Sequence, residues 1–288
     1  MKDRVYVLGT PVHNLTMQET INLVDDAIAG NQHIHHSVVN AGKIVAMHEN
    51  MELRESVINA DIINADGQAV IWISKIFGQP LKERVTGIDL MGKVVELAHR
   101  KNYKIFLLGA QEEVLQKVIE KFSRQYSPEI IAGYRNGYFR KEDEQEVVQQ
   151  IADSKANILF VAISSPVKEN LLYQNRDVLR NVNFIMGVGG SFDVVSGIVK
   201  RAPLWMQGLG LEWFFRVLQE PRRMFKRYLI GNLKFIALVF RYILNDYKFE
   251  PLAKNTTNGQ LEMEVVTSAV AEPKNKKTRR NNLTKIVD

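Results

Sequence analysis

Residues 186–232 have the sequence MGVGGSFDVVSGIVKRAPLWMQGLGLEWFFRVLQEPRRMFKRYLIGN, which contains two different patterns. The first part has the order strand, glycine turn, short helix. That order holds anionic ligands, because free backbone N–H groups and the helix dipole both point at the turn. The second part mixes Trp, Phe, Leu and Met with Arg and Lys, as is typical of a boundary between water and lipid. The segment therefore predicts a phosphate site beside a membrane-facing element.

The chain before this segment alternates between apolar strands and helices. We expect strands at 5–8, 34–39, 61–64, 103–108, 130–131, 158–163 and 182–186. Helices are expected at 16–28, 41–49, 70–77, 90–99, 112–122, 142–152 and 166–179. This alternation predicts an α/β fold with a Rossmann-like, mostly parallel sheet and helices on both of its faces.

Composition and periodicity divide the chain into three parts. Residues 1–200 form the predicted α/β catalytic core. Residues 201–250, with helices expected at 204–218 and 221–244, form a C-terminal basic amphipathic helical appendage that associates with a membrane. From about residue 251 Asn, Thr, Gly, Lys and Arg dominate and the periodicity stops. We therefore expect a disordered basic tail over 251–288.

The overall composition is that of a globular protein, with 288 residues, 45% of them apolar and 24% charged. The absence of cysteine excludes disulfides and thiolate metal sites and fits a cytoplasmic protein. No window contains the roughly 20 apolar residues that span a bilayer. The net charge of +6 is informative because the basic residues gather toward the C-terminus. We expect a protein that is soluble or lies on a membrane without crossing it.

Polar residues and glycines follow most of the predicted strands, at the end where parallel sheets bind ligands. Asp66 lies in the sequence Asn-Ala-Asp-Gly, which fits either a simple turn or a general base that takes a proton from an attacking hydroxyl. No second acidic residue lies close in sequence, so a paired-carboxylate hydrolase is not indicated. The convergence predicts an active site formed by Asn40, Asp66, Gly109, Ser165, Lys168, Glu169, Gly187, Gly189, Gly190 and Asp193.

The glycine turn at residues 187–191 fits either a phosphate-binding turn or a turn needed only for packing. It is not a dinucleotide fingerprint, because the third glycine of that pattern would fall at Phe192. Arg84 is either a clamp for a diphosphate or a solvated arginine. Thr86 and Asp89 also fit the role of caps for the following helix.

The three histidines at 33, 35 and 36 do not favour a metal site. On a strand His36 would face away from His33 and His35, and no acidic or cysteine ligand accompanies them. Nothing in the sequence requires a divalent ion or another cofactor.

The expected helix at 221–244 carries two stripes. One is basic, with Arg223, Arg227, Lys234 and Arg241, and the other is apolar, with Phe225, Leu229, Ile236, Phe240 and Ile243. Either the helix docks on its own core with a solvated basic face, or the basic face attracts anionic headgroups and a lipid diphosphate. Each basic residue near such a surface contributes roughly 1 kcal/mol. A nucleic-acid partner is not favoured, because no DNA- or RNA-binding module is recognisable.

Taken together, these motifs resemble the WecG/TagA/CpsF glycosyltransferases (glycosyltransferase family 26) from about residue 5 to residue 232. The most specific part is GVGGSFDVVSG followed by KRAPLWMQGLGLEWFFRVLQEPRRMFKRYL. Supporting motifs are VNA at 39–41, ADG at 65–67, RVTGIDL at 84–90, GYF at 137–139 and SPVKE at 165–169.

The resemblance implies an inverting hexosyltransferase that needs no metal. It would move N-acetylmannosamine, N-acetylmannosaminuronate or a related hexose or uronate from a UDP-sugar to a polyprenyl-diphosphate-linked acceptor. Such enzymes serve teichoic acid, enterobacterial common antigen, capsule or exopolysaccharide synthesis. The enzyme would be cytoplasmic and peripheral on the inner face of the plasma membrane, with an anionic membrane surface as a partner. The resemblance leaves open whether the protein forms a homo-oligomer.

The resemblance also implies roles for single residues. Asp66 matches the catalytic base, and Asn40 and Arg84 match pocket positions. The nucleotide region corresponds to Tyr138, Gly187, Gly189, Gly190 and Asp193. The segment that meets the membrane and the acceptor diphosphate corresponds to Arg216, Arg222, Arg223 and Arg227.

Two positions depart from the family pattern. Val38 stands where many members have Thr, and Lys168 stands where many have Gln. A cation at position 168 could bind a carboxylate or a phosphate, and a donor with a uronic acid would supply such a carboxylate. Two alternatives from other classes remain: a nucleotide-dependent oxidoreductase, and a non-catalytic membrane-surface adaptor that uses the basic helices.

Overall fold

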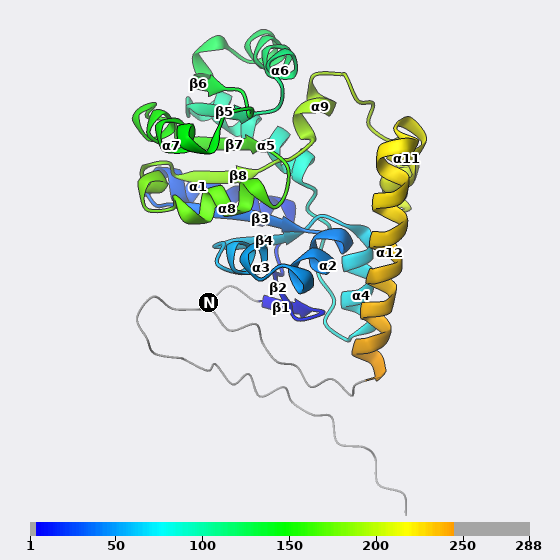
Figure 1. Cartoon of the computed structure of the whole chain (residues 1–288). Helices are drawn as coiled ribbons and strands as arrows, with labels where there is room; N and C mark the ends of the chain where they lie inside the picture. The colour runs from blue at the N-terminus through cyan, green and yellow to red at the C-terminus, as the bar shows by residue number, and fades with distance from the viewer. Residues whose placement is uncertain (1–3, 245–288) are drawn as a thin grey trace, which may run out of the picture. The chain divides into compact units, whose positions relative to one another are not determined.

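A computed structural model describes residues 4–244 of the chain, apart from the side chains of Arg223, Met224 and Arg227. Six strands build its main sheet: β3 (Ile34–Val39), β4 (Ile62–Ala65), β5 (Ile105–Gly109), β6 (Ile131–Arg135), β7 (Ile158–Ala162) and β8 (Phe184–Gly187). They lie in the order β4-β3-β8-β7-β5-β6, and every neighbouring pair is parallel (Figure 1). The predicted α/β fold with a parallel sheet is confirmed.

The apolar runs of the sequence become strands that are buried on both faces. In β5, Ile105 and Leu107 pack into one hydrophobic cluster, while Phe106 and Leu108 pack into another. This follows from the two-residue period of a strand, which sends successive side chains to opposite faces of the sheet.

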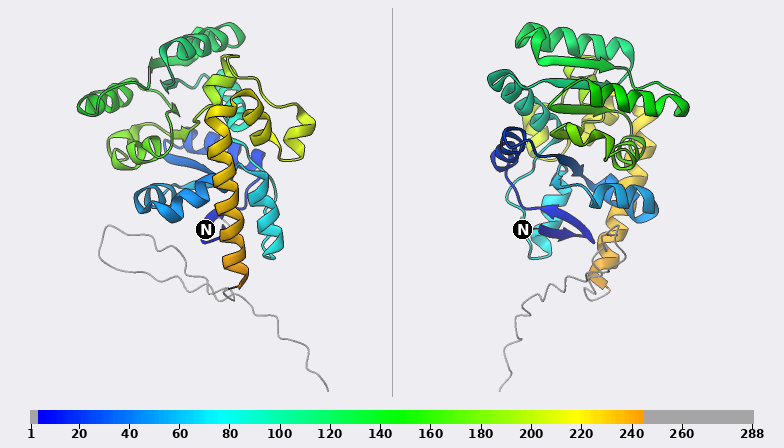
Figure 2. Two further views of the ribbon diagram at one scale, coloured as in Figure 1. Left: turned by 45° about the vertical axis from the view of Figure 1, so that its right-hand side comes forward. Right: turned by 90° about the vertical axis from the view of Figure 1, so that its left-hand side faces the viewer.

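Helices cover both faces of the sheet, as predicted (Figures 1 and 2). One face is covered by α1 (Met17–Ala29), α5 (Gly87–Lys101), α6 (Glu112–Gln125) and α9 (Ser191–Val195). The other is covered by α2 (Ala41–Glu49), α3 (Met51–Ile58), α7 (Glu144–Asp153) and α8 (Val167–Gln174). A capping box begins α1: Thr16 Oγ1 accepts the Glu19 N–H at 3.1 Å, and the Glu19 carboxylate accepts the Thr16 N–H at 2.7 Å.

Three local expectations were wrong or incomplete. The first strand, β1 (Arg4–Val7), pairs antiparallel with an unpredicted β2 (Thr10–His13), so it belongs to a separate hairpin. Helix α3 was not predicted. The single helix expected at 204–218 is two helices, α10 (Leu204–Gly208) and α11 (Glu212–Gln219). The break contains Gly210 at φ +69°, a left-handed conformation that glycine adopts without strain.

The last helix, α12 (Pro221–Leu244), has three faces instead of the expected two. Phe235 is buried, and Leu238, Val239 and Tyr242 pack on the cluster that contains α2. Lys234 on the basic stripe lies 2.6 Å from Glu49 of α2. The predicted apolar stripe is a different one and is exposed along its whole length: Phe225, Leu229, Ile236, Phe240 and Ile243.

Two further expectations concern membrane crossing and the C-terminal tail. Within residues 4–244, no helix combines the length and the apolar character needed to cross a membrane. The tail predicted over 251–288, and residues 245–250 of the predicted appendage, lie outside the described part of the chain.

Candidate active site

The predicted site residues occupy one edge of the sheet, because the carboxyl ends of parallel strands all meet there. Asp66 follows the outer strand β4, Asn40 follows β3, and Gly187 ends β8. Ser165 lies beyond β7, and Gly109 ends β5. The strand order therefore determines the order in which these residues lie along the edge, with Asp66 near one end.

Asp66 is held between two strands and a helix start. Its N–H donates to the Val39 carbonyl at 2.9 Å, and its Oδ1 accepts the Gly87 N–H at 3.1 Å. The neighbouring Gly67 is so close to Asn40 that a Cβ on it would lie 3.0 Å from the Asn40 Cβ. Asn40 Oδ1 in turn accepts the Lys43 N–H at 3.0 Å and caps α2. Asp66 thus takes part in a turn and presents a positioned carboxylate.

Residues 84–89 connect this carboxylate to the C-terminal helices. Thr86 caps α5, its Oγ1 accepting the Asp89 N–H at 3.3 Å, as the capping alternative predicted. Arg84, the predicted diphosphate clamp, is mostly buried and forms an ion pair with α11, its Nη1 lying 3.2 Å from Glu212 Oε2.

Arg201 joins the same network, and sequence reasoning missed it together with Glu212. Its Nη1 and Nη2 donate to the two Asp89 oxygens at 2.6 and 2.7 Å in a bidentate pair. The bond to Asp89 raises the pKa of the Arg201 guanidinium, and the charges of Glu212 and Asp66 add to that rise. Arg201 lay inside a quoted motif, but a partner 112 residues away leaves no local signal.

The glycine turn after β8 meets α11 as well. A Cβ on Gly190 would lie 3.4 Å from Asp193 Oδ2 and 3.5 Å from Arg216 Nη1. Arg216 is four residues after Glu212, so both side chains project from the same side of α11. One helix therefore brings a carboxylate to Arg84 and a guanidinium to the glycine turn.

The N–H groups of this turn are mostly used inside the protein. Val188 and Gly189 both donate to the Val161 carbonyl, at 2.9 and 3.4 Å, and the Ser191 N–H donates to the Val188 carbonyl at 3.1 Å. An anion at the turn would therefore depend more on the charge of Arg216 than on a cradle of amides.

Lys168 and Glu169 form a buried ion cluster with Lys43. Glu169 Oε1 lies 2.6 Å from Lys168 Nζ and 2.8 Å from Lys43 Nζ, and the three side chains are 5–10% exposed. Burial would raise the pKa of the Glu169 carboxyl, but the two ammonium groups outweigh it and lower that pKa to about 2. The Lys168 stem lies against Gly187, where a Cβ would be 2.8 Å from Lys168 Cε. The carboxylate that Lys168 meets thus comes from this chain.

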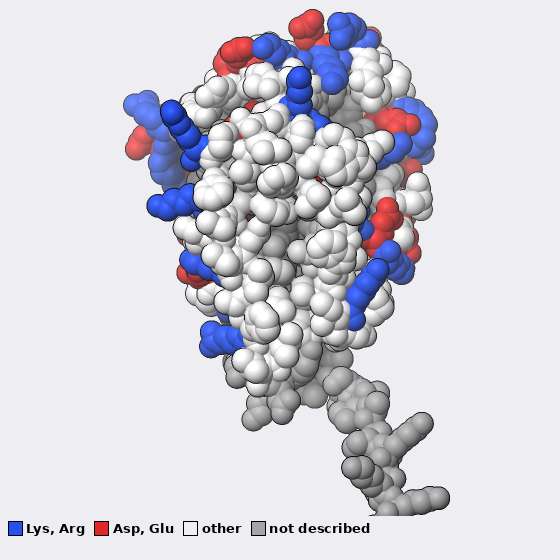
Figure 3. Space-filling model, turned by 90° about the vertical axis from the view of Figure 1, so that its right-hand side faces the viewer, with Lys and Arg blue, Asp and Glu red and all other residues white. Residues whose placement is uncertain are grey.

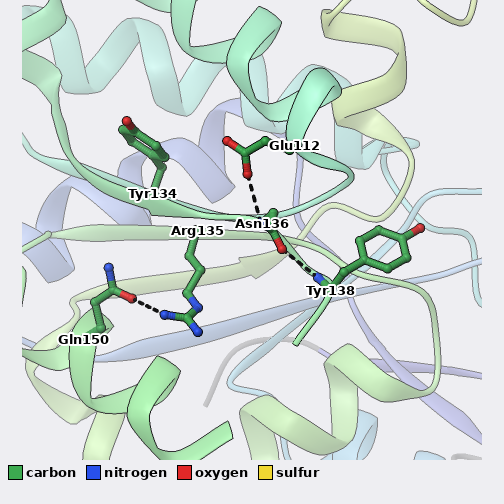
Figure 4. A pocket seen from close by; sticks show the side chains of 6 residues that line it. All are labelled: Glu112, Tyr134, Arg135, Asn136, Tyr138 and Gln150. Carbon is green, nitrogen blue, oxygen red and sulfur yellow. Dashed lines mark hydrogen bonds between the residues drawn. The ribbon is translucent and has the colours of Figure 1, made fainter. Parts of the chain in front are cut away.

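A shallow cavity of about 300 Å³ lies beyond β6 at the other end of the edge (Figure 4). Tyr138 borders it and is 73% exposed. The Tyr138 N–H donates to Asn136 Oδ1 at 3.1 Å, and Asn136 Nδ2 donates to Glu112 Oε2 at 2.9 Å. The remaining lining residues are Tyr134, Arg135 and Gln150. Because its lining is polar and aromatic, the cavity suits a planar, hydrogen-bonding group.

Gly109 explains how β5 and β7 approach each other at this edge. It has φ +114°, and a Cβ on it would lie 2.7 Å from the Ala162 carbonyl carbon. Any larger residue would therefore collide with backbone. Gly137 packs on it in turn, since a Cβ there would lie 3.0 Å from the Gly109 Cα.

Two of the three histidines have structural partners for their rings, and the His35 backbone N–H donates to Asp61 Oδ2 at 2.8 Å. His36 is buried and its Nε2 lies 2.8 Å from Asn64 Oδ1, while His33 Nδ1 lies 2.6 Å from the Val182 carbonyl oxygen. Over residues 4–244, no three His, Asp or Glu side chains gather in a geometry that could hold a metal ion.

Comparison with known proteins decides the class. A family model described as "Glycosyl transferase WecG/TagA/CpsF family" matches residues 5–249 of this chain. The chain belongs to the WecG/TagA/CpsF family. It is a glycosyltransferase, so the oxidoreductase and the non-catalytic adaptor are set aside.

Two relatives of this WecG/TagA/CpsF glycosyltransferase are each named N-acetylglucosaminyldiphosphoundecaprenol N-acetyl-beta-D-mannosaminyltransferase. The protein from Bacillus subtilis (strain 168) is 36% identical over 215 residues, covering 75% of this chain and 82% of that protein. The protein from Bacillus spizizenii (strain W23) is 36% identical over 189 residues, covering 65% of this chain and 72% of that protein.

Proposed function

We propose that this chain transfers N-acetylmannosamine from UDP-N-acetylmannosamine to N-acetylglucosamine carried on undecaprenyl diphosphate, with inversion at the anomeric carbon. The names of the two relatives support the transferred sugar and the acceptor. This proposal favours N-acetylmannosamine over the uronate donors that the sequence analysis left open. The Lys168 ammonium that would recognise a sugar carboxylate already faces the Glu169 carboxylate at 2.6 Å.

One observation carries the mechanism: the Asp66 carboxylate stands at the carboxyl edge of the sheet with its orientation fixed by the Gly87 N–H. In the proposed step the acceptor hydroxyl loses its proton to Asp66 while its oxygen attacks the anomeric carbon. The bond from that carbon to the donor phosphate oxygen breaks, and its electron pair leaves with UDP. A single displacement of this kind needs one base and a stabilised leaving group, with no covalent nucleophile.

The leaving diphosphate gains negative charge, and two arginines are positioned to meet it. Arg84 lies within the segment that also fixes Asp66, and Arg216 approaches the glycine turn at Gly190. Guanidinium groups bind phosphate oxygens with paired, charge-assisted hydrogen bonds. We assign the uracil to the cavity beside Tyr138, whose exposed ring offers a stacking surface.

The other predicted site residues form the walls. Asn40 and Gly67 bring α2 against Asp66, while Gly109 and Gly187 let neighbouring elements approach the edge. Lys168 and Glu169 act beneath the edge as a buried support. We propose residues 1–200 as the catalytic core and 201–250 as the appendage that holds it at the inner face of the plasma membrane. In the appendage Arg222 is exposed, whereas the Arg223 and Arg227 side chains lie outside the described part.

The test is a UDP-release assay with the full-length protein and a polyprenyl-diphosphate N-acetylglucosamine acceptor. Donors compared are UDP-N-acetylmannosamine, UDP-N-acetylglucosamine and UDP-N-acetylmannosaminuronate, and the product is analysed by NMR. We expect the first donor to react fastest and to give the β-linked disaccharide lipid. A faster uronate reaction, or an α-linked product, would contradict the proposal.

A further inference from the structure

The three tryptophans of the chain are all on the surface. Trp72 in α4 (Gln68–Ile76) is 50% exposed, Trp205 in α10 is 64% exposed and Trp213 in α11 is 38% exposed. Tryptophan buries most of its area in an ordinary soluble domain. Its common exposed setting is the boundary between water and lipid, where the ring is half in each phase.

These tryptophans belong to one surface. The turn between α10 and α11 rests on α4, since a Cβ on Gly210 would lie 2.8 Å from the Gln68 Cβ and 3.5 Å from the Trp72 ring. Trp213 joins α11 to α12, its ring centroid lying 6.0 Å from that of Tyr228. Figure 2 shows α4, α10, α11 and α12 side by side on the same side of the molecule.

Helix α4 is apolar on two opposite faces. Val70, Ile71 and Ile73 are buried against the core, while Trp72 and Ile76, four residues apart, are exposed next to each other. A helix that has already buried one apolar face and still exposes another is typical of a surface with a second partner.

Helix α12 extends this surface. Its exposed apolar face adds Phe225, Leu229, Leu233, Ile236, Phe240 and Ile243. Figure 3 shows the result as a broad face that is nearly free of charged side chains at its centre, with Lys and Arg and fewer Asp and Glu side chains around its margin. We call the exposed apolar residues of α4, α10, α11 and α12 the apolar face.

The charged residues on the helices of the apolar face are mainly basic, although α11 carries one of each sign, Glu212 and Arg216. Helices α4, α10 and α12 contain no Asp or Glu, and their charged residues are Lys75, Arg222, Arg223, Lys226, Arg227, Lys234 and Arg241. Two copies of this face would bring these cations together, whereas an anionic bilayer would neutralise them. The occupant that fits is therefore a membrane surface.

We propose that the catalytic core itself touches the bilayer through Trp72 and Ile76 of α4, which act together with the C-terminal helices. This inference rests on the proposed function, in which the acceptor is a membrane lipid. Helix α4 begins directly after Asp66 and Gly67. Insertion of Trp72 and Ile76 would therefore hold the base at a fixed height above the headgroups, where the acceptor hydroxyl arrives.

The first test uses full-length variants that keep one tryptophan each, made by Trp→Phe substitution of the other two. Each is mixed with vesicles of phosphatidylglycerol and phosphatidylcholine, with and without brominated acyl chains. We expect the emission of Trp72 to shift to shorter wavelength and to be quenched by the brominated lipid about as strongly as that of Trp205.

The outcomes separate this inference from the proposed function. Quenching of Trp205 and Trp213 but not of Trp72 would overturn the contact through α4 and leave membrane binding by the C-terminal helices intact. Quenching of none, with transferase activity preserved, would overturn membrane contact through the whole apolar face. Emission shifts that follow protein concentration without vesicles would assign the face to a second copy.

A second test does not depend on fluorescence. Ile76→Asp should weaken vesicle binding about tenfold, the loss expected when a buried aliphatic side chain is removed. Val178→Asp is the control, since Val178 is an exposed apolar residue of the 3₁₀ turn Val178–Asn181, outside the apolar face. Ile76→Asp should also slow transfer to an acceptor in vesicles and leave transfer to a short-chain soluble acceptor unchanged. Equal vesicle binding by both variants would contradict the inference.

Discussion

Replacing Glu169 by glutamine tests the buried ion cluster beneath the site. The substitution keeps the shape of the side chain and removes its charge, so the Lys43 and Lys168 ammonium groups at 2.8 and 2.6 Å lose their shared anion. Breaking a buried ion pair by removing one partner costs about 3–5 kcal/mol. The fall in the Glu169 pKa from 4.5 to about 2 corresponds to about 3 kcal/mol. Both routes predict a loss of about 3 kcal/mol, or a Tm lower by about 6–12 °C.

The measurement is urea unfolding at pH 7, followed by circular dichroism. Glu113→Gln is the matched control, because Glu113 pairs with Lys117 at 2.6 Å on the surface of α6, where solvent screens the pair and leaves it little net effect on stability. Lys168→Gln is a second comparison. It leaves the Lys43–Glu169 pair in place and should cost much less than Glu169→Gln. Equal losses for Glu169→Gln and Glu113→Gln would refute the reasoning.

The same cluster gives a pH dependence with a definite sign. A carboxyl whose pKa is lower in the folded state binds protons more tightly when unfolded, so its stabilisation is present above pH 4.5. It is lost as the pH falls from 4.5 toward 2. The stability difference between the wild-type chain and Glu169→Gln should therefore shrink over this window, and a constant difference would contradict the assignment.

Three further predictions concern other parts of the site. Arg84→Ala should lower kcat/KM about 10–100-fold through lost charge-assisted bonds to the diphosphate, and unchanged steady-state kinetics would exclude Arg84 as the clamp. Gly109→Ala should destabilise the fold by more than about 2 kcal/mol in urea unfolding, because its Cβ would meet backbone at 2.7 Å, whereas Gly78→Ala has open space and should cost about 1 kcal/mol. Arg201→Ala should lower the free energy of unfolding by roughly 1 kcal/mol, and Arg201→Lys should lower it by most of that amount, because lysine cannot form the bidentate pair with Asp89. A lysine variant as stable as the wild-type chain would contradict that geometry.

The parts of the fold that local chemistry determines could be predicted from sequence. The apolar runs predicted five strands of the parallel sheet closely, whereas β6 was expected only at residues 130–131 and runs over Ile131–Arg135. The helix expected from Thr16 begins there as α1, and the predicted range 41–49 is the observed α2, although the role of Asn40 as its N-cap was not predicted. These features depend on side-chain periodicity and on hydrogen bonds between residues three apart.

The parts that depend on distant contacts could not be predicted. Periodicity found an apolar stripe on α12 but not which stripe packs on the core, because both Phe235 and Phe240 are apolar and only the tertiary fold buries one of them. The pairing of Arg201 with Asp89 joins residues far apart in the chain, and the short β2 and α3 carry too few periods for a pattern. The site was therefore predicted as a set of strand ends, without the Glu212 carboxylate of α11 and with Arg216 assigned to the acceptor diphosphate instead of the glycine turn.

Asp66→Asn tests the central claim most directly. The variant keeps the hydrogen bond from the Gly87 N–H but cannot accept the acceptor proton. Turnover with UDP-N-acetylmannosamine and the lipid acceptor should fall about 10²–10⁴-fold, while UDP binding measured by calorimetry stays at the wild-type level. Asp177→Asn on the exposed surface is the control. Near wild-type turnover by Asp66→Asn would contradict its role as the base.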